Sequence, residues 1–473
     1  MNLRRLGQGV LPLLLGAFAA LGQAPHGCWW ATITALAVFF WMQRPTRSFL
    51  PGFVLGLGYF LVALRWIQEP FQVDADRYGW MAPFAVLFLS AGMALFWGLA
   101  TKLATGWRLP VALTIAEAAR ALILTGFPWA LVGHIWVDTP VAQLAAFFGP
   151  LALTALTFAL AASLAMLVQR RWIAISVPVL CAIIAIVLRP PAPLESDGPT
   201  VRLIQPNVLQ HEKWDPDKRV QYFNRMLTFS GVAPRPDLIV WPEVAIPILL
   251  DFAGDQLDQM ADMAAGIPLV FGVNRSEGRR FHNSFVVMGA ASDPLAIYDK
   301  KHLVPFGEFI PFGEFFSQFG ITQFAPSQGG GFTAGTRDGI IDIPGIGAVR
   351  ALICYEGIFA EEIAQSARPD VMILITNDAW FGDDAGPYQH LAQARLRAIE
   401  QGLPMVRVAN TGVSAMIDPY GRIIDAIPLG TAGFRDVPLP APLAPTLYVR
   451  LGDWPVLFLL GLLAIIGVAR RKT

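Results

Sequence analysis

The chain of 473 residues is rich in apolar side chains: 55% of its residues are hydrophobic and only 15% are charged. Soluble domains carry about 25% charged residues, so a large part of this chain lies in lipid or in a deep core. The formal net charge is zero, and Lys and Arg are not clustered as a nucleic-acid-binding surface would require. The composition therefore favours a membrane protein and excludes a nucleic-acid partner.

Charge and cysteine are distributed unevenly along the chain. Residues 1–189 hold 12 Lys or Arg and 5 Asp or Glu, whereas residues 190–473 hold 23 and 30. Cys28 and Cys181 lie in apolar segments, where a cysteine is ordinarily a small buried side chain. Cys354 is the one cysteine in the more polar part, so a disulfide framework is not expected.

Long apolar segments dominate the first part of the sequence. Helices are expected at about 8–22, 27–42, 50–67, 80–100, 109–125, 141–168 and 172–188, with an eighth at 453–469. A helix needs about 20 apolar residues to span the hydrocarbon. The pattern predicts a membrane bundle of about eight transmembrane helices, and the short first two segments leave a re-entrant hairpin open.

Basic residues recur on every second connection between these segments. They are Arg4, Arg5, Arg44, Arg47, Lys102, Arg108, Arg170, Arg171, Arg470, Arg471 and Lys472. Short loops rich in Lys and Arg stay in the cytoplasm, so the alternation predicts eight crossings with both termini inside. The segment at about 190–450 is then expected on the extracytoplasmic side.

Glu117 and Arg120 lie three residues apart inside the fifth apolar segment. Charges within a membrane often mark a functional site. Opposite charges at this spacing also form structural pairs that face the interior of a bundle. The sequence leaves both interpretations open.

Short β-rich runs replace the long apolar segments after a linker rich in proline. Strands are expected at 201–206, 237–241, 268–273, 284–289, 349–353, 371–376, 404–409 and 413–417, and helices at 216–230, 253–264, 357–367 and 387–401. Alternating strands and helices predict a layered α/β domain. The expected domains are a helical bundle at 1–189, a linker at 190–199, an α/β domain at 200–440, and a last helix with a tail at 441–473.

Three polar segments follow apolar strands, where loops over a rigid sheet often carry active sites. They present Glu243, Lys300 and Cys354 in turn. A thiolate attacks a carbonyl, a carboxylate accepts and returns protons, and an ammonium stabilises an oxyanion. The three residues form a coherent set for acyl transfer, although their spacing alone is a weak indication.

The strand before Cys354 runs directly into a predicted helix. The N–H groups at the start of that helix would point to the sulfur, so we expect a lowered thiol pKa and donors for an oxyanion. Lys301 is the alternative candidate for the active lysine. A papain-like pairing of Cys354 would need one of the histidines at 282, 302 and 390, and no local motif supports it.

Several stretches of the sequence resemble the apolipoprotein N-acyltransferase family, a membrane-bound branch of the nitrilase superfamily. They are Gln205-Pro206-Asn207-Val208 followed by Lys213-Trp214, Trp241-Pro242-Glu243, Tyr298 through Glu308, Cys354-Tyr355-Glu356, and Thr376-Asn377-Asp378-Ala379-Trp380-Phe381. The resemblance covers essentially the whole chain. It implies a nitrilase-like αββα sandwich for residues 200–440 and a catalytic triad of Glu243, Lys300 and Cys354.

By matched position, the resemblance also gives active-site roles to Trp214, Glu308, Tyr355 and Glu356. Two of these residues have simpler interpretations. Trp214 is equally compatible with the core of the domain. Glu356 would also act favourably as a negative charge at the start of the following helix.

The resemblance implies ping-pong acyl transfer at the bacterial inner membrane. A fatty-acyl chain would pass from a phospholipid, expected to be phosphatidylethanolamine, through a thioester on Cys354. The acceptor would be the α-amino group of the diacylglyceryl-cysteine at the N-terminus of an apolipoprotein. This is the final step of bacterial lipoprotein maturation, and the catalytic domain would face the periplasm. No cofactor is expected, and no His or Cys cluster has the spacing of a metal site.

Two other functions compete with acyl transfer. A membrane-tethered nitrilase-like amidase would use the same triad but would not need seven preceding helices. A transporter or receptor with a ligand-binding outer domain would explain the helices but not the triad. Inactivation of turnover by thiol alkylation would separate this last class from the two enzymes.

Phenylalanines crowd the Gly- and Pro-punctuated stretch after the lysine motif. They are Phe306, Phe309, Phe312, Phe315, Phe316, Phe319 and Phe324. Ordinary core is one interpretation, but loops seldom bury so many aromatic side chains. An apolar loop beside a catalytic lysine suits a gate that meets lipid, and Phe315 and Phe316 are its candidates.

Overall fold

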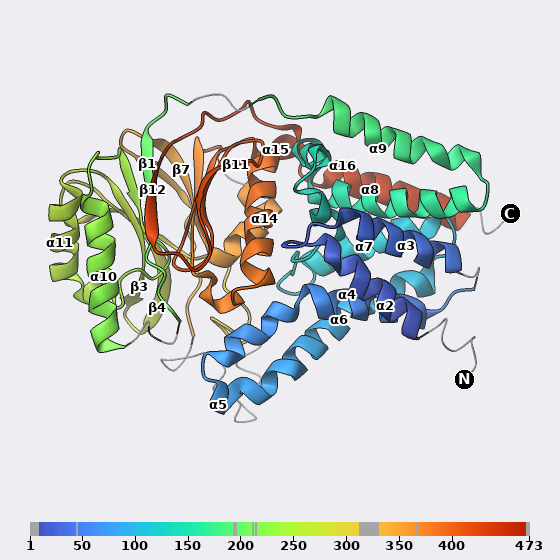
Figure 1. Cartoon of the computed structure of the whole chain (residues 1–473), viewed down its shortest axis with the longest axis horizontal. Helices are drawn as coiled ribbons and strands as arrows, with labels where there is room; N and C mark the ends of the chain where they lie inside the picture. The colour runs from blue at the N-terminus through green and yellow to red at the C-terminus, as the bar shows by residue number, and fades with distance from the viewer. Residues whose placement is uncertain are drawn as a thin grey trace. The chain divides into compact units, whose positions relative to one another are not determined.

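A computed structural model describes residues 9–43, 46–192, 196–210, 212, 215–311, 331–364 and 367–469 (Figure 1). The chain forms two compact units. A helical unit contains residues 1–193, 384–402 and 444–473, and a sheet unit contains residues 194–383 and 403–443. Each unit is therefore built from segments that are distant in the sequence.

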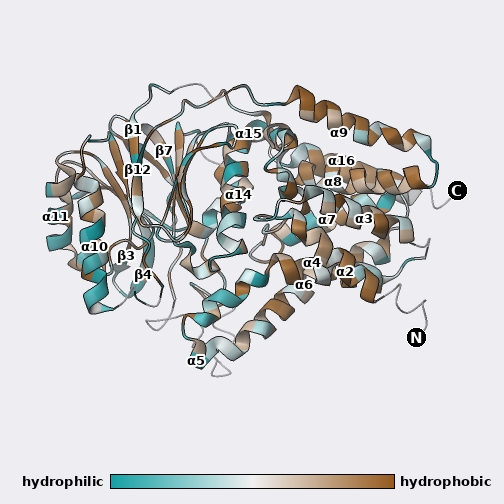
Figure 2. Ribbon diagram, in the orientation of Figure 1, coloured by the Kyte–Doolittle hydropathy of each residue, from teal (hydrophilic) through white to brown (hydrophobic). Residues whose placement is uncertain are grey.

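The helical unit collects the apolar helices of the chain, which Figure 2 shows mainly in brown. Its α-helices are α2 (Val10–Ala19), α3 (Trp29–Met42), α4 (Phe49–Ala63), α5 (Ala75–Tyr78), α6 (Ala82–Leu103), α7 (Arg108–Leu122), α8 (Ala145–Val168), α9 (Ser176–Val187), α14 (Ala385–Gln401), α15 (Leu447–Leu451) and α16 (Trp454–Ala469). Large apolar side chains such as Phe88, Ile186 and Phe458 are exposed on these helices. An apolar exterior of this kind is suited to lipid, not to water.

The predicted count of about eight membrane spans is not confirmed. Within the described residues, two helical stretches are long and apolar enough to cross a membrane, Ala75–Leu103 and Pro140–Val168. A third is added if the bent pair Phe49–Ala63 and Arg65–Gln72 forms one span. The other predicted segments do form helices, but these are shorter than the roughly 20 residues that the hydrocarbon requires.

Helices α2 and α4 approach each other closely because glycine faces the partner helix on both sides. A Cβ atom on Gly16 would lie 1.9 Å from the carbonyl oxygen of Leu55, and one on Gly58 would lie 2.0 Å from that of Leu13. Small residues that let backbones touch are a common means of packing helices in membranes. A larger side chain at either position would force the two helices apart.

Helix α14 comes from the range 200–440 that the sequence assigns to the α/β domain, yet it packs within the helical unit. Its Gln389 side chain accepts a hydrogen bond from Trp129 Nε1 at 2.7 Å. The same side chain donates to the carbonyl oxygens of Ala24 and Ala63, at 3.2 and 3.1 Å. The apolar face of α14 lies in a hydrophobic cluster of that unit. The helix is thus tied to the loops and helices before residue 190.

The sheet unit contains two sheets, each with six strands in the part of the chain that the structure describes. The first has the order β12-β1-β2-β3-β4-β5 and the second β11-β10-β9-β8-β7-β6. The strands are β1 (Thr200–Gln205), β2 (Leu238–Val240), β3 (Leu269–Glu277), β4 (Arg280–Met288), β5 (Pro294–Asp299), β6 (Ile340–Ile343), β7 (Gly347–Ile353), β8 (Val371–Thr376), β9 (Met405–Ala409), β10 (Ser414–Ile417), β11 (Ile423–Ile427) and β12 (Gly433–Pro438).

The two sheets face each other, with β1 against β9 and β10 and with β4 against β7. Helices α10 (Pro216–Gly231) and α11 (Gly254–Ala264) cover the outer face of the first sheet (Figure 1). Their apolar side chains join those of β1 to β4 in a continuous core around the fully buried Trp241. Asp215 caps α10 by accepting hydrogen bonds from the N–H groups of Asp217 and Lys218. The unit is the layered α/β domain that the sequence predicts.

Candidate active site

Three strand ends of the sheet unit carry the residues that the sequence singles out. Glu243 follows β2, Lys300 follows β5 directly, and Cys354 follows β7. The three residues are 6%, 1% and 5% exposed, and the ammonium of Lys300 interacts electrostatically with both Glu243 and Cys354. Two strands of the first sheet and one of the second therefore bring these side chains into one buried site.

Lys300 lies between two carboxylates. Its Nζ is 2.9 Å from Glu308 Oε1 and 3.9 Å from Glu243 Oε1. Burial disfavours the ammonium, but the charges of Glu308, Glu243 and Cys354 outweigh burial and raise the pKa of Lys300 above its ordinary value. The lysine is therefore a fixed positive charge, and it is suited to stabilise negative charge in a reaction.

Glu308 is held by a tight turn from Val304 to Phe309. The N–H of Glu308 donates to the carbonyl oxygen of Val304 at 2.8 Å, and the N–H of Val304 donates back to Glu308 Oε2 at 2.8 Å. Phe306, in the same turn, has a φ of 64°. The carboxylate that anchors Lys300 thus has a rigid support of its own.

Asn283 of β4 links the two carboxylates, and sequence reasoning missed it. Its Nδ2 donates to Glu243 Oε1 at 2.7 Å and to Glu308 Oε1 at 3.2 Å. These acceptors fix the orientation of the amide, since its oxygen cannot face a carboxylate. The available signal was an amide in the polar first half of β4, which pairs with β5 and so lies next to the lysine motif.

Cys354 occupies a strained turn between β7 and a 3₁₀ helix that spans Cys354–Ile358. Its φ is 48°, a left-handed conformation that residues other than glycine seldom adopt. The prediction of a lowered thiol pKa is wrong: burial and then the charge of Glu243 raise it, and Lys300 offsets them only in part. A raised pKa favours the protonated thiol, so ionisation of Cys354 calls for a base, and the Glu243 carboxylate acts electrostatically on the sulfur.

Glu356 joins the lysine segment to the cysteine segment. Its Oε1 accepts from Tyr298 Oη at 2.6 Å and from the N–H groups of Lys301 and His302 at 2.7 and 3.3 Å. Its Oε2 accepts from the N–H of Ile353 at 2.8 Å. Burial raises the pKa of this carboxyl, although these donors act in the opposite direction. The geometry makes Glu356 a tie between two loops of the site.

Tyr355 lies in an aromatic group next to the cysteine. Its ring packs edge-on against His302 and Phe359, with centroids 5.5 and 5.1 Å apart. His302 stacks on Phe359 at 3.8 Å and contacts Glu362 through Nδ1 at 2.7 Å. His302 is therefore part of this aromatic group, as a packing residue beside the nucleophile position.

Three predicted site residues lie outside the described residues: Trp214, Phe315 and Phe316. Of the phenylalanine-rich stretch, the structure describes the first part, up to residue 311. Phe306 is 62% exposed there. This exposed phenylalanine lies in the turn that carries Glu308, at the start of the phenylalanine-rich stretch.

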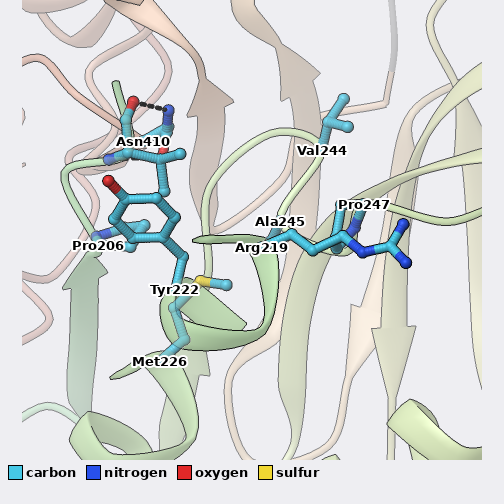
Figure 3. A pocket seen from close by; sticks show the side chains of 9 residues that line it. Pro206, Arg219, Tyr222, Met226, Val244, Ala245, Pro247 and Asn410 are labelled. Carbon is cyan, nitrogen blue, oxygen red and sulfur yellow. Dashed lines mark hydrogen bonds between the residues drawn. The ribbon is translucent and has the colours of Figure 1, made fainter. Parts of the chain in front are cut away.

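A small cavity lies between helix α10 and the segment that follows Glu243 in the chain (Figure 3). Arg219 and Tyr222 of α10 line it, together with Val244 and Ala245, which directly follow Glu243. Asn410 closes another side, where its Nδ2 donates to the carbonyl oxygen of Val208 at 3.0 Å. Among the described residues, no group of three or more His, Cys, Asp or Glu side chains is arranged to hold a metal ion.

Two family models match parts of this chain. The family model of carbon-nitrogen hydrolases matches residues 200–441, which confirms the predicted nitrilase-like α/β domain. The model of the apolipoprotein N-acyltransferase N-terminal domain matches residues 15–163. A solved variant of an amidase from Nesterenkonia AN1, of the nitrilase superfamily, covers 54% of this chain and 94% of its own, at 17% identity and a TM-score of 0.39.

Relatives match this chain over nearly its whole length. Apolipoprotein N-acyltransferases from Rhodopseudomonas palustris and Bradyrhizobium diazoefficiens are each 37% identical to this chain and cover 98% of it and 95% of their own length. The one from Brucella suis is 36% identical over 95% of this chain and 93% of its own. These relatives favour acyl transfer over the amidase alternative. The chain therefore belongs to the apolipoprotein N-acyltransferase family, and it is a membrane acyltransferase that N-acylates lipoproteins.

Proposed function

We propose that Cys354, Glu243 and Lys300 carry out this acylation by a ping-pong mechanism. Glu243 removes the proton of the Cys354 thiol, and the thiolate attacks the ester carbonyl of a phospholipid acyl chain. Lys300 and the backbone N–H of Tyr355 stabilise the oxyanion. The tetrahedral intermediate collapses to a thioester, and the lysophospholipid oxygen leaves with the proton that Glu243 held.

The second half-reaction reverses these roles. The α-amine of the diacylglyceryl-cysteine of an apolipoprotein attacks the thioester. Glu243 receives the proton of the amine and returns it to the departing Cys354 thiolate, while Lys300 again stabilises the oxyanion. The products are an N-acylated lipoprotein and the free enzyme.

One observation carries this proposal: the buried ammonium of Lys300 lies 3.9 Å from Glu243 and acts electrostatically on Cys354. A buried cation beside a base and a thiol is the set that acyl transfer needs, and it lies in a site from which most water is excluded. The supporting residues follow from their contacts. Glu308 holds Lys300 in place, and Glu356 and Tyr355 hold the turn that carries the nucleophile.

The location of the enzyme is also part of the proposal. We place it in the bacterial inner membrane as a multi-pass protein, with residues 200–440 in the periplasm and phosphatidylethanolamine as the acyl donor. The basic residues on alternate connections support this orientation. Both substrates carry acyl chains, so a membrane anchor reduces their encounter to a lateral search within the bilayer.

The proposed lipid gate at Phe315 and Phe316 and the active-site role of Trp214 rest on the sequence. A gate that guides acyl chains should discriminate between donors by chain length. Replacing Phe315 and Phe316 with serine should therefore slow long-chain donors more than a short-chain, water-soluble ester. If the two phenylalanines are core residues, both donors slow together and the melting temperature falls.

Intact-mass measurement of the purified full-length enzyme in phospholipid micelles tests the mechanism. Without an acceptor, we expect a fatty-acyl adduct that peptide mapping places on Cys354. Cys354→Ala and Cys354→Ser should form none, and a Cys28→Ala/Cys181→Ala variant should acylate normally. An adduct that persists in Cys354→Ala would overturn the assignment of the nucleophile.

Thiol labelling in intact spheroplasts tests the orientation, with the cysteine-reduced variant as background. A cysteine introduced at Ser196 should react with a membrane-impermeant maleimide. One introduced at Thr46 should react only after permeabilisation. The opposite pattern would place the active site in the cytoplasm and refute the proposed topology.

A further inference from the structure

A second buried chain of polar groups approaches Cys354 from the side of strand β8. Strands β7 and β8 are parallel, and their register pairs Ile353 with Ile375. The next residues, Cys354 and Thr376, therefore stand side by side at the same sheet edge. Thr376 is fully buried, and its hydroxyl hydrogen-bonds with Cys354. This contact brings a hydroxyl to the sulfur from the neighbouring strand of the same sheet.

The hydroxyl of Thr376 has a second partner. Its Oγ1 is 2.9 Å from Asp378 Oδ1, and both side chains are fully buried. The opposite carboxylate oxygen, Oδ2, receives Nη2 of Arg407 at 2.5 Å, and that ion pair is also fully buried. A Cβ atom on Gly412 would lie 2.6 Å from Asp378 Oδ2, so the carboxylate is enclosed from that side too. Asp378 is thus a fixed acceptor behind the threonine.

A hydroxyl has one proton, so it cannot donate to the sulfur and to Asp378 at the same time. While Cys354 is a thiol, the sulfur is itself a donor, and the threonine proton is best placed on the Asp378 carboxylate. When Glu243 has removed the thiol proton, the sulfur becomes an anion and the stronger local acceptor. A rotation about the Cβ–Oγ1 bond then redirects the same proton to the sulfur, without any change in the protonation of Thr376.

We propose that Thr376 is a positioning residue for the nucleophile, whose hydroxyl donates to Cys354 only while the sulfur is a thiolate and to Asp378 at the other stages. The inference rests on the proposed role of Cys354. The charged groups that face the sulfur are Glu243, Lys300 and Asp378, and the negative charge of Asp378 disfavours a thiolate. The Thr376 hydroxyl lies between the Asp378 carboxylate and the sulfur. Its hydrogen bond to the thiolate offsets the repulsion between these two negative charges.

The test compares full-length variants in the single-turnover acylation assay, followed by intact mass across a range of pH. Thr376→Val keeps the shape of the side chain and removes the hydroxyl. We expect acylation about tenfold slower at neutral pH, the scale of losing one hydrogen bond to a charged group. Its pH dependence should be displaced upward by about one unit. Thr376→Ser retains the donor and should behave as the unmodified enzyme does.

Ser414→Ala is the matched control, because it also removes a fully buried hydroxyl, one that donates to Gln205 Oε1 at 2.6 Å. It should lower the melting temperature without moving the pH profile. An equal slowing of Thr376→Val at every pH, or a Thr376→Ser variant as slow as Thr376→Val, would show that the residue only fills space and would overturn the inference. So would unchanged acylation by Thr376→Val.

If Thr376→Val does not fold, Thr376→Ala takes its place in the same assay, since it also removes the hydroxyl and does not crowd the site. The proposed function fails separately from this inference. Acylation of the Cys354→Ala variant would refute the nucleophile itself. A Cys354-dependent reaction with an unmoved pH profile in the threonine variants would refute only the role of Thr376.

Discussion

Each unit of the molecule buries a cationic side chain beside a glutamate. The two sites differ in how many N–H groups of the cation find hydrogen-bond acceptors. In the helical unit, Arg120 donates twice to Glu117, at 2.7 and 2.8 Å. It also donates to the carbonyl oxygens of Phe127, Trp129 and Ala130. These bonds use every N–H of the guanidinium, and Glu117 and Arg120 are both fully buried.

In the sheet unit, Lys300 has one carboxylate within hydrogen-bonding distance among the residues that the structure describes, that of Glu308. The second carboxylate, of Glu243, is 3.9 Å away. The Oδ1 of Asn283 is buried and has no partner among the described residues. An arginine with all its donors used supports the backbone of a loop. An ammonium has three N–H groups, so Lys300 can still donate to an oxyanion, as the proposed mechanism requires.

The Glu117–Arg120 pair, which the sequence leaves open between structural and functional interpretations, therefore has the geometry of a structural pair. Trp97 Nε1 and the N–H of Val132 donate to the two oxygens of Glu117, so the carboxylate is saturated as well. The difference between the two networks gives a set of predictions. Substitutions around Lys300 should change rates, and substitutions around Arg120 should change stability.

Glu243→Gln is expected to have the largest effect on rate. Glutamine has nearly the shape of glutamate but cannot accept the thiol proton. Since general-base catalysis contributes about 10²- to 10⁴-fold, single-turnover acylation should fall by at least about 10²-fold. The melting temperature should stay close to that of the unmodified enzyme. Normal acylation by this variant, measured by intact mass, would exclude Glu243 as the base of the first half-reaction.

The thiol of Cys354 should show its raised pKa in its reaction with iodoacetamide. Burial and the charge of Glu243 raise the pKa, so the thiolate is scarce near neutral pH and increases throughout the alkaline range. Alkylation should rise by about tenfold per pH unit beyond pH 8.5, where an ordinary thiol begins to level off. A plateau near or below pH 7 would mean that the thiol pKa is lowered.

Asn283→Ala should have an intermediate effect. The variant keeps the triad but removes the amide that bridges Glu243 and Glu308. We expect acylation about tenfold slower, the scale of losing a hydrogen bond to a charged group. Asn283→Asp should be slower still, because a third carboxylate would repel the other two. If Asn283→Ala acylates at the normal rate, the amide does not position the base.

Glu117→Gln should leave the acylation rate per folded molecule unchanged. It removes the charge that compensates Arg120, and breaking a buried ion pair in this way destabilises by about 3–5 kcal/mol. The melting temperature in detergent should therefore fall, while acylation normalised to folded protein stays constant. A loss of acylation in a variant with an unchanged melting temperature would give the pair a functional role.

The sequence predicts the interior of the sheet unit better than its margins. The eight strands expected from apolar runs correspond to β1–β4 and β7–β10. The strands that were missed, β5, β6, β11 and β12, are the edge strands of the two sheets in the described part of the chain. Edge strands bury only one side of their backbone, and β11 shows this in its exposed Ile423 and Ile424. Three of them, β6, β11 and β12, also contain an aspartate at an internal position, so they lack the continuous apolar pattern that marks a central strand.

The sequence predicts the site residues that follow strand ends. It does not predict the features of the site that depend on tertiary packing. Glu243 and Cys354 follow strands that the sequence predicts, β2 and β7, whereas Lys300 follows β5, which was missed, and was identified from its motif alone. Asn283 was missed because its role depends on the register of β4 against β5. The thiol pKa was predicted in the wrong direction, because a helix start suggests donors while the sequence does not reveal burial. The unit to which α14 belongs depends on tertiary contacts that no local pattern records.

Replacing Lys300 with arginine and Arg120 with lysine tests the comparison most directly. Lys300→Arg keeps the charge but enlarges the head group and changes its donor geometry. Arg120→Lys leaves acceptors without donors, and each orphaned buried group costs about 1–3 kcal/mol. Both variants are measured by single-turnover acylation and by thermal unfolding in the same detergent. We expect Lys300→Arg to melt normally and acylate at least about 10²-fold more slowly, and Arg120→Lys to melt lower and acylate normally once corrected for folded protein. Normal acylation by Lys300→Arg, together with slow acylation by a stable Arg120→Lys, would contradict the account.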